Sequence, residues 1–397
     1  MESMPKDGPA QEGRGFATEL IREYYVKSSG IGPERIEARE FGVGTFDTKI
    51  LSRHLSFKTK EELKGYLAAN APPYISYSTA YYRNPAFRPM ENKGWTGSEL
   101  VFDLDVDDMD IECQKKHGKS WVCENCLDSV KLETIKLIEE FLMRDFGFSK
   151  NEIAVNFSGN RGYHVHIKRD SLQSLSRKAR EEISDYIAGN GITFEDFFRF
   201  EDFLHTSGRR GKKLAGPRPE DAGWSGRIAR SFLSKLKAGP EALASAGMMP
   251  AQARSLFKKR ALLEMGIKNG NWDIVEIKNK TAFWSALLEK MAVAQSDRID
   301  KNVTKDPTHL IRMPDTIHGG TGLIARNVGS LADLESFDPM SHAIAFRGRE
   351  IEVTANSDYE IVMDGRTFGP FKDEKARLPV YAGMYLYLKG LAYINST

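Results

Sequence analysis

The sequence feature that most constrains this fold is an acidic strand pattern at residues 99–108, Glu-Leu-Val-Phe-Asp-Leu-Asp-Val-Asp-Asp. With the two-residue period of a β-strand, one face carries Leu100, Phe102, Leu104 and Val106, and the other carries Val101, Asp103, Asp105 and Asp107. The first face suits a core, while carboxylates on the second lie close enough to share a cation. Such hard oxygen ligands favour Mg²⁺ or Mn²⁺. A strand that ends in an acidic turn would give the same run, so the neighbouring segments must decide.

Composition excludes several classes of protein. The chain has 397 residues, of which 41% are hydrophobic, enough for two or three domains with substantial cores. Its 57 basic and 55 acidic residues leave a net charge of only +2, so any affinity for nucleic acid must come from local patches. The N-terminal segment is polar, and no apolar run reaches the roughly 18 residues of a membrane span. We therefore expect a cytoplasmic protein that does not enter a membrane.

Alternating strand-like and helix-like segments predict a mixed α/β fold. Residues 1–15 have the composition of a flexible leader, and residues 16–170 form the first part of the mixed domain. From 171 to 295 the periodicity is mainly helical, which indicates an inserted subdomain, and strand character returns in 296–397. The individual elements expected near the motifs are strands at 36–41, 74–82, 152–157, 163–167 and 342–346 and a helix at 130–146.

All three cysteines of the chain lie in one short stretch, Cys113, Cys123 and Cys126, together with His117. Three thiolates and an imidazole make a Cys₃His set that can close around Zn²⁺, and the Cys-x₂-Cys pair is typical of a zinc knuckle at 113–126. A full ligand set leaves no open position, which predicts a structural site. The spacing fixes His117 least firmly. Three unrelated cysteines that happen to cluster are the alternative.

Two of the expected strands are joined by a short connection, Ser158-Gly-Asn-Arg-Gly162, which is followed by His164. Its glycines allow close backbone approach, its amides and the Ser158 hydroxyl can donate to phosphate oxygens, and Arg161 adds a bidentate charge. This combination indicates a phosphate-binding loop, although any glycine-containing hairpin with an arginine has the same pattern. Residues 207–211 echo it without the histidine, and we interpret them as a basic loop.

A third cluster follows the helical part, with Asp300, Arg312 and His318 ahead of a glycine-rich turn that ends at Gly322. A carboxylate, an arginine, a histidine and a flexible turn are the groups that a nucleoside triphosphate site needs. Taken alone, Asp300 could equally cap a helix or a turn, and His318 could equally be a turn residue.

Together these segments resemble the small, catalytic subunit of the archaeal and eukaryotic DNA primase family, and the archaeal members more than the eukaryotic ones. The resemblance covers about residues 35–170 and 296–325, in the family's order. It rests on Arg39-Glu-Phe41, Arg53-His-Leu-Ser-Phe57, Lys93-Gly-Trp95, Phe102-Asp-Leu-Asp105, the Cys/His cluster, Ser158-Gly-Asn-Arg-Gly-Tyr-His164, Asp300, His309-Leu-Ile-Arg312 and His318. Two positions depart from it: Asp315 stands where relatives often have glycine, and Gly320 where many have lysine.

The resemblance implies an archaeo-eukaryotic primase catalytic fold with a zinc knuckle and a helical insertion. It also implies that Asp103, Asp105 and Asp300 hold two Mg²⁺ or Mn²⁺ ions for nucleotidyl transfer. Glu40 would assist metal or nucleotide binding, unless it is only a strand glutamate that points outward. The residues that would bind the incoming triphosphate are Ser158, Arg161, His164, Arg312 and His318, with Arg53 as a further contact.

The function expected from the resemblance is synthesis of short RNA primers, and also of DNA primers, on a single-stranded DNA template from ribonucleoside and deoxynucleoside triphosphates. A primase-like repair or translesion polymerase that extends existing ends is the alternative among enzymes. A non-catalytic, zinc-stabilised nucleic-acid-binding subunit is the alternative outside them, but it predicts eroded carboxylates.

Two kinds of partner follow from the same resemblance. The first is a large iron–sulfur subunit in a heterodimer, since this chain has no cysteine left to ligate a cluster in addition to zinc. The second is the template, whose binding should be electrostatic and salt-sensitive. The basic residues expected to contribute are Arg209, Arg210, Lys212 and Lys213, or the cluster at 254–260.

Overall fold

The acidic stretch forms strand β6, Leu100–Asp105, at the edge of a four-stranded sheet with the order β14-β7-β8-β6. Moving away from β6, the next strands are β8, Gly162–Ile167, β7, Ile153–Phe157, and β14, Asn327–Gly329, and each pairs antiparallel with the strand before it. The strand period predicted from the sequence holds through Asp105. The chain then turns into the 3₁₀ helix η3, Val106–Asp108, so Asp107 leaves the face that carries Asp103 and Asp105.

The computed structural model describes residues 9–204, 210–274, 277, 279–296 and 301–395. The chain divides into two units: unit 1 comprises Met1–Lys136, Ser149–Glu181 and Asp300–Thr397, and unit 2 comprises Leu137–Phe148 and Glu182–Ile299. The acidic strand and the Cys/His cluster both belong to unit 1. The insertion expected at 171–295 overlaps unit 2, which also contains the separate segment Leu137–Phe148.

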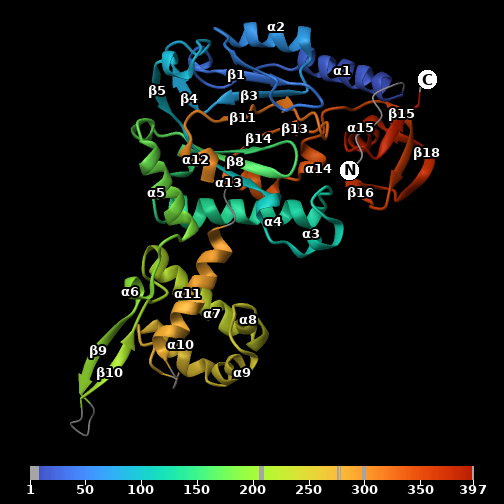
Figure 1. Ribbon diagram of the computed structural model, residues 1–397. Helices are drawn as coiled ribbons and strands as arrows, with labels where there is room; N and C mark the ends of the chain where they lie inside the picture. Colours follow the sequence, from blue (N-terminus) through green and yellow to red (C-terminus); the bar gives the residue numbers. More distant parts are fainter. Residues whose placement is uncertain (1–8, 205–209, 275–276, 278, 297–300, 396–397) are drawn as a thin grey trace. The chain divides into compact units, whose positions relative to one another are not determined.

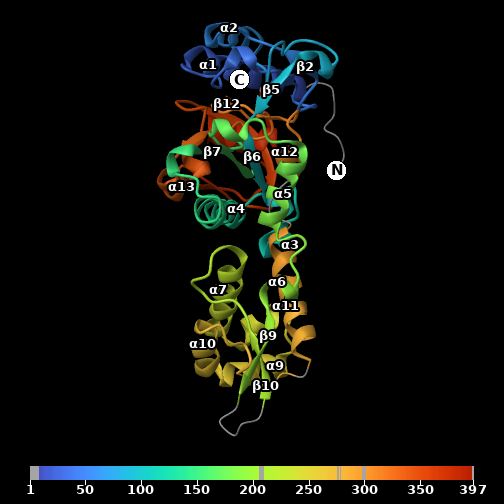
Figure 2. The ribbon, with the colours of Figure 1, turned by 90° about the vertical axis from the view of Figure 1, so that its left-hand side faces the viewer.

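The apolar face of the β14-β7-β8-β6 sheet is covered by two helices, α4, Glu124–Lys136, and α13, Leu331–Ser336 (Figures 1 and 2). The rings of Phe157 and Tyr163 project from this face and pack against Phe337, with centroid separations of 5.8 and 6.4 Å. All three side chains are buried. Burial of such aromatic area contributes strongly to folding, so this face is part of the core of unit 1.

A second four-stranded sheet has the order β11-β3-β1-β2. Its strands are β1, Phe41–Gly44, β2, Ser52–Leu55, β3, Tyr74–Ser78, and β11, Leu310–Arg312. Helices α1, Pro9–Lys27, and α2, Lys60–Asn70, lie on its outer side in both ribbon views (Figures 1 and 2). On the inner side, the ring of Tyr77 in β3 is stacked on that of His166 in β8, with centroids 6.5 Å apart. The polar face of the first sheet therefore faces the second sheet.

The remaining elements of unit 1 surround these two sheets. Its shorter strands are β4, Ala80–Tyr82, β5, Trp95–Ser98, β12, Thr316–Ile317, and β13, Ile324–Ala325, and its short helices include α3, Glu112–His117, α12, Lys301–Lys305, and α14, Pro339–His342. The C-terminal part adds β15, Glu350–Ser357, β16, Ile361–Met363, β17, Arg366–Phe368, β18, Phe371–Pro379, α15, Val380–Leu388, and β19, Ala392–Ile394. Helix α5, Arg177–Ala188, continues from unit 1 into unit 2.

Unit 2 is built mainly from helices around an aromatic core. Trp272 and Trp284 meet edge to face with centroids 4.7 Å apart, and Phe198 and Phe232 pack against both. Its elements are α6, Phe194–Phe197, β9, Arg199–Leu204, β10, Arg210–Ala215, α7, Gly223–Ala238, α8, Pro240–Ser245, α9, Pro250–Lys258, α10, Arg260–Lys268, and α11, Lys280–Ser296. The β9–β10 hairpin was not expected from the sequence, because its strands carry many charged residues and show no regular apolar alternation.

Several expected elements differ in extent. The first helix begins at Pro9, inside the segment interpreted as a flexible leader. The strand expected at 36–41 is a 3₁₀ turn followed by β1, and no strand occupies 342–346. The helix expected at 130–146 is α4 followed by a π-helical segment, Leu137–Met143.

Within the part of the chain that the structure describes, no helix is both long enough and apolar enough to span a bilayer.

Candidate functional site

Polar side chains form a row across the inner face of the β14-β7-β8-β6 sheet. In register, Asp103 pairs with His164, His164 pairs with Asn156, and Asn156 pairs with Asn327. The Nε2 atom of His164 lies 3.6 Å from an oxygen of Asp103. Strand alternation puts Asp105 on the same face, opposite Gly162. The two carboxylates predicted as catalytic are thus brought together on one surface.

The Asp105 carboxylate is half-buried and accepts a hydrogen bond from the backbone N–H of Asp107 at 2.9 Å. Burial raises the pKa of Asp105 to about 6, against this hydrogen bond and the positive charge of Arg161, which lower it. Burial disfavours the charged form of this carboxylate, and a bound cation would stabilise that charged form.

The third predicted carboxylate, Asp300, lies outside the described residues. The helix that follows, α12, contacts β6 directly: the hydroxyl of Thr304 donates a hydrogen bond of 2.8 Å to the carbonyl oxygen of Val101. The C-terminal part of the chain thus returns to the acidic strand.

The connection between β7 and β8 forms a closed loop from Ser158 to Gly162. The Ser158 N–H donates to the Gly162 carbonyl at 2.9 Å, and the Ser158 hydroxyl oxygen accepts from the Gly162 N–H at 3.1 Å. A Cβ at 162 would lie 2.2 Å from the Leu104 carbonyl oxygen, so only glycine lets this end of β8 approach β6. The loop predicted to bind phosphate therefore lies directly beside the strand that carries Asp103 and Asp105.

Gly159 fixes this loop against the turn that carries His318. Its φ of +82° is in the left-handed region, and a Cβ there would lie 2.7 Å from the Cβ of His318. The hydroxyl of Thr321 donates a hydrogen bond of 2.6 Å to the Gly159 carbonyl oxygen. Two segments that the sequence predicted separately are therefore in contact.

Arg161 is the loop cation, and it forms an ion pair. Its Nη1 lies 2.7 and 2.8 Å from the two carboxylate oxygens of Asp107 and also donates to the Lys119 carbonyl oxygen at 2.8 Å. Asp107 was expected on the metal-facing side of the strand. The structure instead pairs it with Arg161, because η3 turns it away from β6.

The two predicted site histidines are buried and uncharged. Burial, with smaller contributions from His166 and Arg312, lowers the pKa of His164 to about 3. Burial also lowers the pKa of His318 well below its usual value, and Arg312, Lys49, Lys389 and Arg161 act in the same direction. The rings of His318 and Tyr74 meet edge to face at 5.2 Å. Neutral imidazoles close to several cations fit a site for an anion.

Arg312 is half-buried at the end of β11. Its Nη1 donates to the Ile75 carbonyl oxygen at 3.1 Å, and its guanidinium lies 4.6 Å above the Tyr74 ring centroid. Burial lowers its pKa to about 10, which leaves it protonated at neutral pH. No carboxylate forms an ion pair with Arg312 in the part of the chain that the structure describes.

The structure adds a cation that sequence reasoning did not identify. Lys389 directly follows α15, and its Nζ lies 3.3 Å from the side-chain oxygen of Asn160 in the β7–β8 loop. No local pattern marks it, because it follows an almost wholly buried helix near the end of the chain. Only the spatial proximity to Asn160 could have revealed it.

Glu40, the tentative metal ligand, is completely buried. Its carboxylate accepts from Arg53 Nε at 3.0 Å and from the His54 backbone N–H at 3.2 Å, and it lies 3.3 Å from Lys93 Nζ. The interpretation of Glu40 as an outward strand glutamate is therefore wrong. Two cationic side chains already neutralise this carboxylate. Arg53, expected near the triphosphate, is held by Glu40 and the Thr308 carbonyl oxygen.

A second buried ion network surrounds Glu99, the residue just before β6. Glu99 pairs with Arg39 Nη2, accepts from the Tyr81 hydroxyl at 3.0 Å and lies 2.8 Å from His166 Nδ1. Burial alone would raise the pKa of Glu99, but Arg39 and His166 hold it well below its usual range. Arg39 and Glu40 thus belong to two separate buried networks.

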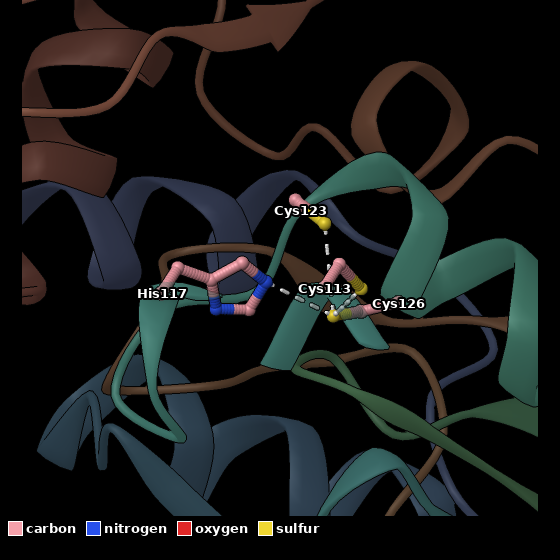
Figure 3. Close-up of side chains that lie close together, drawn as sticks. All are labelled: Cys113, His117, Cys123 and Cys126. Carbon is pink, nitrogen blue, oxygen red and sulfur yellow. Dashed lines mark hydrogen bonds between the residues drawn. The ribbon is translucent and has the colours of Figure 1, made fainter. Parts of the chain in front are cut away.

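The Cys/His cluster forms a compact ligand set (Figure 3). The donor atoms of Cys113, His117, Cys123 and Cys126 all lie within 4.8 Å of one another. The Cys126 sulfur lies 3.3 Å from that of Cys113, 3.7 Å from that of Cys123 and 3.4 Å from His117 Nε2. The other ring nitrogen of His117 is 2.8 Å from the Gly118 carbonyl oxygen, which leaves Nε2 free as a ligand. These four residues could hold a tetrahedral metal ion.

Carboxylates on one sheet face, a glycine loop beside them and Arg312 on the facing sheet are together typical of a nucleotide-binding enzyme. A comparison with protein families identifies its kind: residues 102–330 match the model of the DNA primase small subunit, which is more than half of the chain. The chain belongs to the DNA primase small-subunit family.

Individual relatives match over nearly the whole chain. The DNA primase small subunit PriS of Methanothrix thermoacetophila is 33% identical over 391 residues, covering 94% of this chain and 97% of the relative. The protein of the same name from Methanosarcina barkeri is 32% identical over 406 residues, and the two chains are covered to 95% each. These matches confirm the family resemblance, the mixed α/β primase fold and the enzyme class expected from the sequence.

Proposed function

We propose that this chain is the catalytic subunit that synthesises short RNA primers on single-stranded DNA, with DNA primers as a second product. The observation that carries the proposal is the placement of Asp103 and Asp105 on one sheet face, beside the β7–β8 loop and His164. Membership of the primase small-subunit family supports it.

The proposed metal site takes Mg²⁺ or Mn²⁺ on Asp103 and Asp105, with Asp300 as the third ligand. The donor chemistry fits, since both described carboxylates share one face of the sheet and carboxylate oxygens are the hard ligands that either ion prefers. Two bound ions would supply Lewis-acid activation of a 3′-hydroxyl and neutralise charge at the α-phosphate. The chain's own contribution is to hold the carboxylates at fixed positions on paired strands.

The triphosphate would lie against the β7–β8 loop, where Ser158 and the loop amides donate hydrogen bonds. Arg312 supplies positive charge from the facing sheet, and the neutral His164 and His318 can each donate one hydrogen bond to an anion. Arg161 would have to share its guanidinium between Asp107 and phosphate. Arg53 and Glu40 would act indirectly, by holding β2 against β1.

We extend the proposal to zinc binding, binding partners and cellular location. Zn²⁺ on the Cys/His cluster would be structural, because four ligands complete its tetrahedron. The partners would be single-stranded DNA, ribonucleoside and deoxynucleoside triphosphates and a large iron–sulfur subunit. The cytoplasmic location expected from the sequence stays a prediction.

The direct test is synthesis on unprimed single-stranded DNA with labelled nucleoside triphosphates and Mg²⁺ or Mn²⁺, with and without the large subunit. Asp103→Asn and Asp105→Asn should each reduce product by more than about 100-fold, since even residues that only support metal ligands are worth 10–100-fold. Asp110→Asn is the matched control, because Asp110 is exposed outside the sheet and pairs with Lys115.

The outcome separates the alternatives. Short products from wild type that vanish in both variants support a metal-dependent primase. Extension only from a supplied primer would instead favour a repair or translesion polymerase. DNA binding without any synthesis under these conditions would contradict a catalytic role.

A further inference from the structure

Lys389 is held at a defined position next to the β7–β8 loop. Helix α15, which it follows, is buried along most of its length, and the Lys389 N–H donates to the Tyr385 carbonyl oxygen at 3.0 Å. The ammonium group lies 5.6 Å from the Tyr385 ring centroid. Tyr385 is itself buried, so the lysine extends over a rigid aromatic surface toward Asn160.

The ammonium group is only partly satisfied. A lysine carries three N–H donors, and here one hydrogen bond goes to the neutral amide oxygen of Asn160. Within the described residues, no carboxylate forms an ion pair with Lys389. Half-burying a charge without an opposite charge is costly, and an anionic ligand would offset that cost.

The surroundings of Lys389 are those of the proposed nucleotide site. Burial first, and then the charge of Arg161, lower its pKa to about 8, while Asp107 and Asp105 act in the opposite direction. The positive charge of Lys389 also contributes to the lowered pKa of buried His318. Lys389 thus lies among Asn160, Arg161 and the acidic strand.

The ion pair between Asp107 and Arg161 makes the positive charge of Lys389 important for binding an anion. Both carboxylate oxygens of Asp107 contact Arg161, so the loop arginine brings little net charge to a ligand. Lys389 and Arg312 are then the two half-buried site cations without an ion-pair partner among the described residues. They come from elements on opposite sides of His318 in the sequence.

We propose that Lys389 is a further nucleotide-binding residue, whose ammonium group binds the phosphates of the nucleoside triphosphate beside the β7–β8 loop. This inference rests on the proposed function. It assigns to the C-terminal helix α15 a direct part in substrate binding. Because the contact is with phosphate, it should favour triphosphates over monophosphates regardless of the base.

The test is equilibrium binding of ATP and AMP, with Mg²⁺, to the full chain by calorimetry. Lys389→Met keeps the length of the side chain but removes the charge, and should weaken ATP binding about 10- to 100-fold, the value of a hydrogen bond to a charged group. AMP binding should change less than about threefold, and Lys389→Arg should retain most of the ATP affinity. Lys375→Met is the matched control, because Lys375 is exposed on β18.

Two different failures can be told apart. If wild type binds ATP and Lys389→Met binds it equally well, the inference is wrong and the proposed function stands. If wild type binds no ATP, the proposed function itself is contradicted. Equal losses of ATP and AMP binding in Lys389→Met and Lys389→Arg would indicate a purely structural role and overturn the inference.

Discussion

At the scale of single residues, the site depends on charges that are buried in pairs. Glu99 is only 14% exposed and Arg39 only 1%, yet both are ionic. Such a pair contributes little net stability relative to apolar residues, but removing one member leaves the other charge buried and unpaired. His166 joins the pair from β8, so this network connects the two facing sheets.

Glu99→Gln should destabilise the chain by about 3 kcal/mol at pH 7, because Arg39 would keep its buried charge without a counterion. The folded-state pKa of Glu99 is depressed, so its stabilising contribution is fully present above its unfolded pKa of about 4.3 and is lost progressively as pH falls from there through the folded-state pKa. Urea unfolding of wild type and variant at pH 7 and at about pH 3 would measure this loss.

The difference in free energy of unfolding between wild type and Glu99→Gln should therefore shrink on acidification. Glu360→Gln serves as control, since Glu360 is exposed and its replacement should change stability by less than about 0.5 kcal/mol at either pH. A difference that is independent of pH would show that the carboxylate charge does not stabilise the fold.

For single residues, the sequence could predict those positions that depend only on neighbouring residues in the chain. Asp103 and Asp105 could be placed on one face because strand alternation is a property of adjacent residues. Lys389 could not be predicted, because its proximity to Asn160 depends on packing between segments far apart in the chain. The burial of Glu40 could not be predicted for the same reason: its partners Arg53 and Lys93 come from other elements.

At the scale of elements, the β7–β8 loop and the turn after β12 act as one rigid surface. The contact depends on Gly159, which combines a left-handed backbone with a close approach to His318. Both the loop and the turn were visible in the sequence, but the contact between them was not, since no local signal pairs two turns.

Gly159→Ala should lower the free energy of unfolding by about 2 kcal/mol or more, because strain at positive φ adds to a collision with His318. Gly30→Ala is the matched control: Gly30 has a φ of +71° but nothing within 4 Å of the added Cβ, so it should cost only about 1 kcal/mol. Urea unfolding would measure both, and ATP binding should weaken only in Gly159→Ala. Equal costs would mean that the His318 contact contributes nothing.

The Cys/His cluster joins α3 to the start of α4, the helix that covers the core face of the acidic sheet. Wild type should contain about one zinc per chain by elemental analysis. Cys126→Ser should abolish this zinc content and lower the midpoint temperature of thermal unfolding. Asn125→Ser, at an exposed neighbouring position, should retain zinc.

His117→Ala should weaken zinc binding without abolishing it, since three thiolates would remain. Full zinc retention in Cys126→Ser would rule out this cluster as the site. Full affinity in His117→Ala would rule out the histidine as the fourth ligand.

At the scale of the whole molecule, the two units differ in what the sequence reveals. Unit 1 carries polar motifs at fixed spacings, so its fold class and much of its site could be predicted. Unit 2 is defined by an aromatic core around Trp272 and Trp284, whose helices come from separate segments. Its boundary in the middle of the helix expected at 130–146 has no local signal, because the helical pattern runs through it.

The exposed β9–β10 hairpin is the expected template contact in unit 2. Arg210→Glu combined with Lys212→Glu should weaken binding to single-stranded DNA and reduce the slope of log affinity against log salt by about 0.7 per lost phosphate contact. Both side chains are exposed on β10, whereas Arg209 lies outside the described residues. Fluorescence anisotropy over a salt series would measure the slope.

Lys375→Glu supplies the control for added negative charge on an exposed strand of unit 1. An unchanged affinity and salt slope in the hairpin variant would exclude this surface as a template contact.

The register of β6 against β8 has a consequence for misfolded chains. A slip of one residue would exchange the two faces of β6, placing Asp103 and Asp105 against α4 and turning Phe102 and Leu104 to the polar face of the sheet. A chain with that error would bury two carboxylates without partners and would be too unstable to persist. Degradation of unstable chains would therefore also remove chains with a shifted β6. The chains that remain would have Asp103 and Asp105 on the correct face.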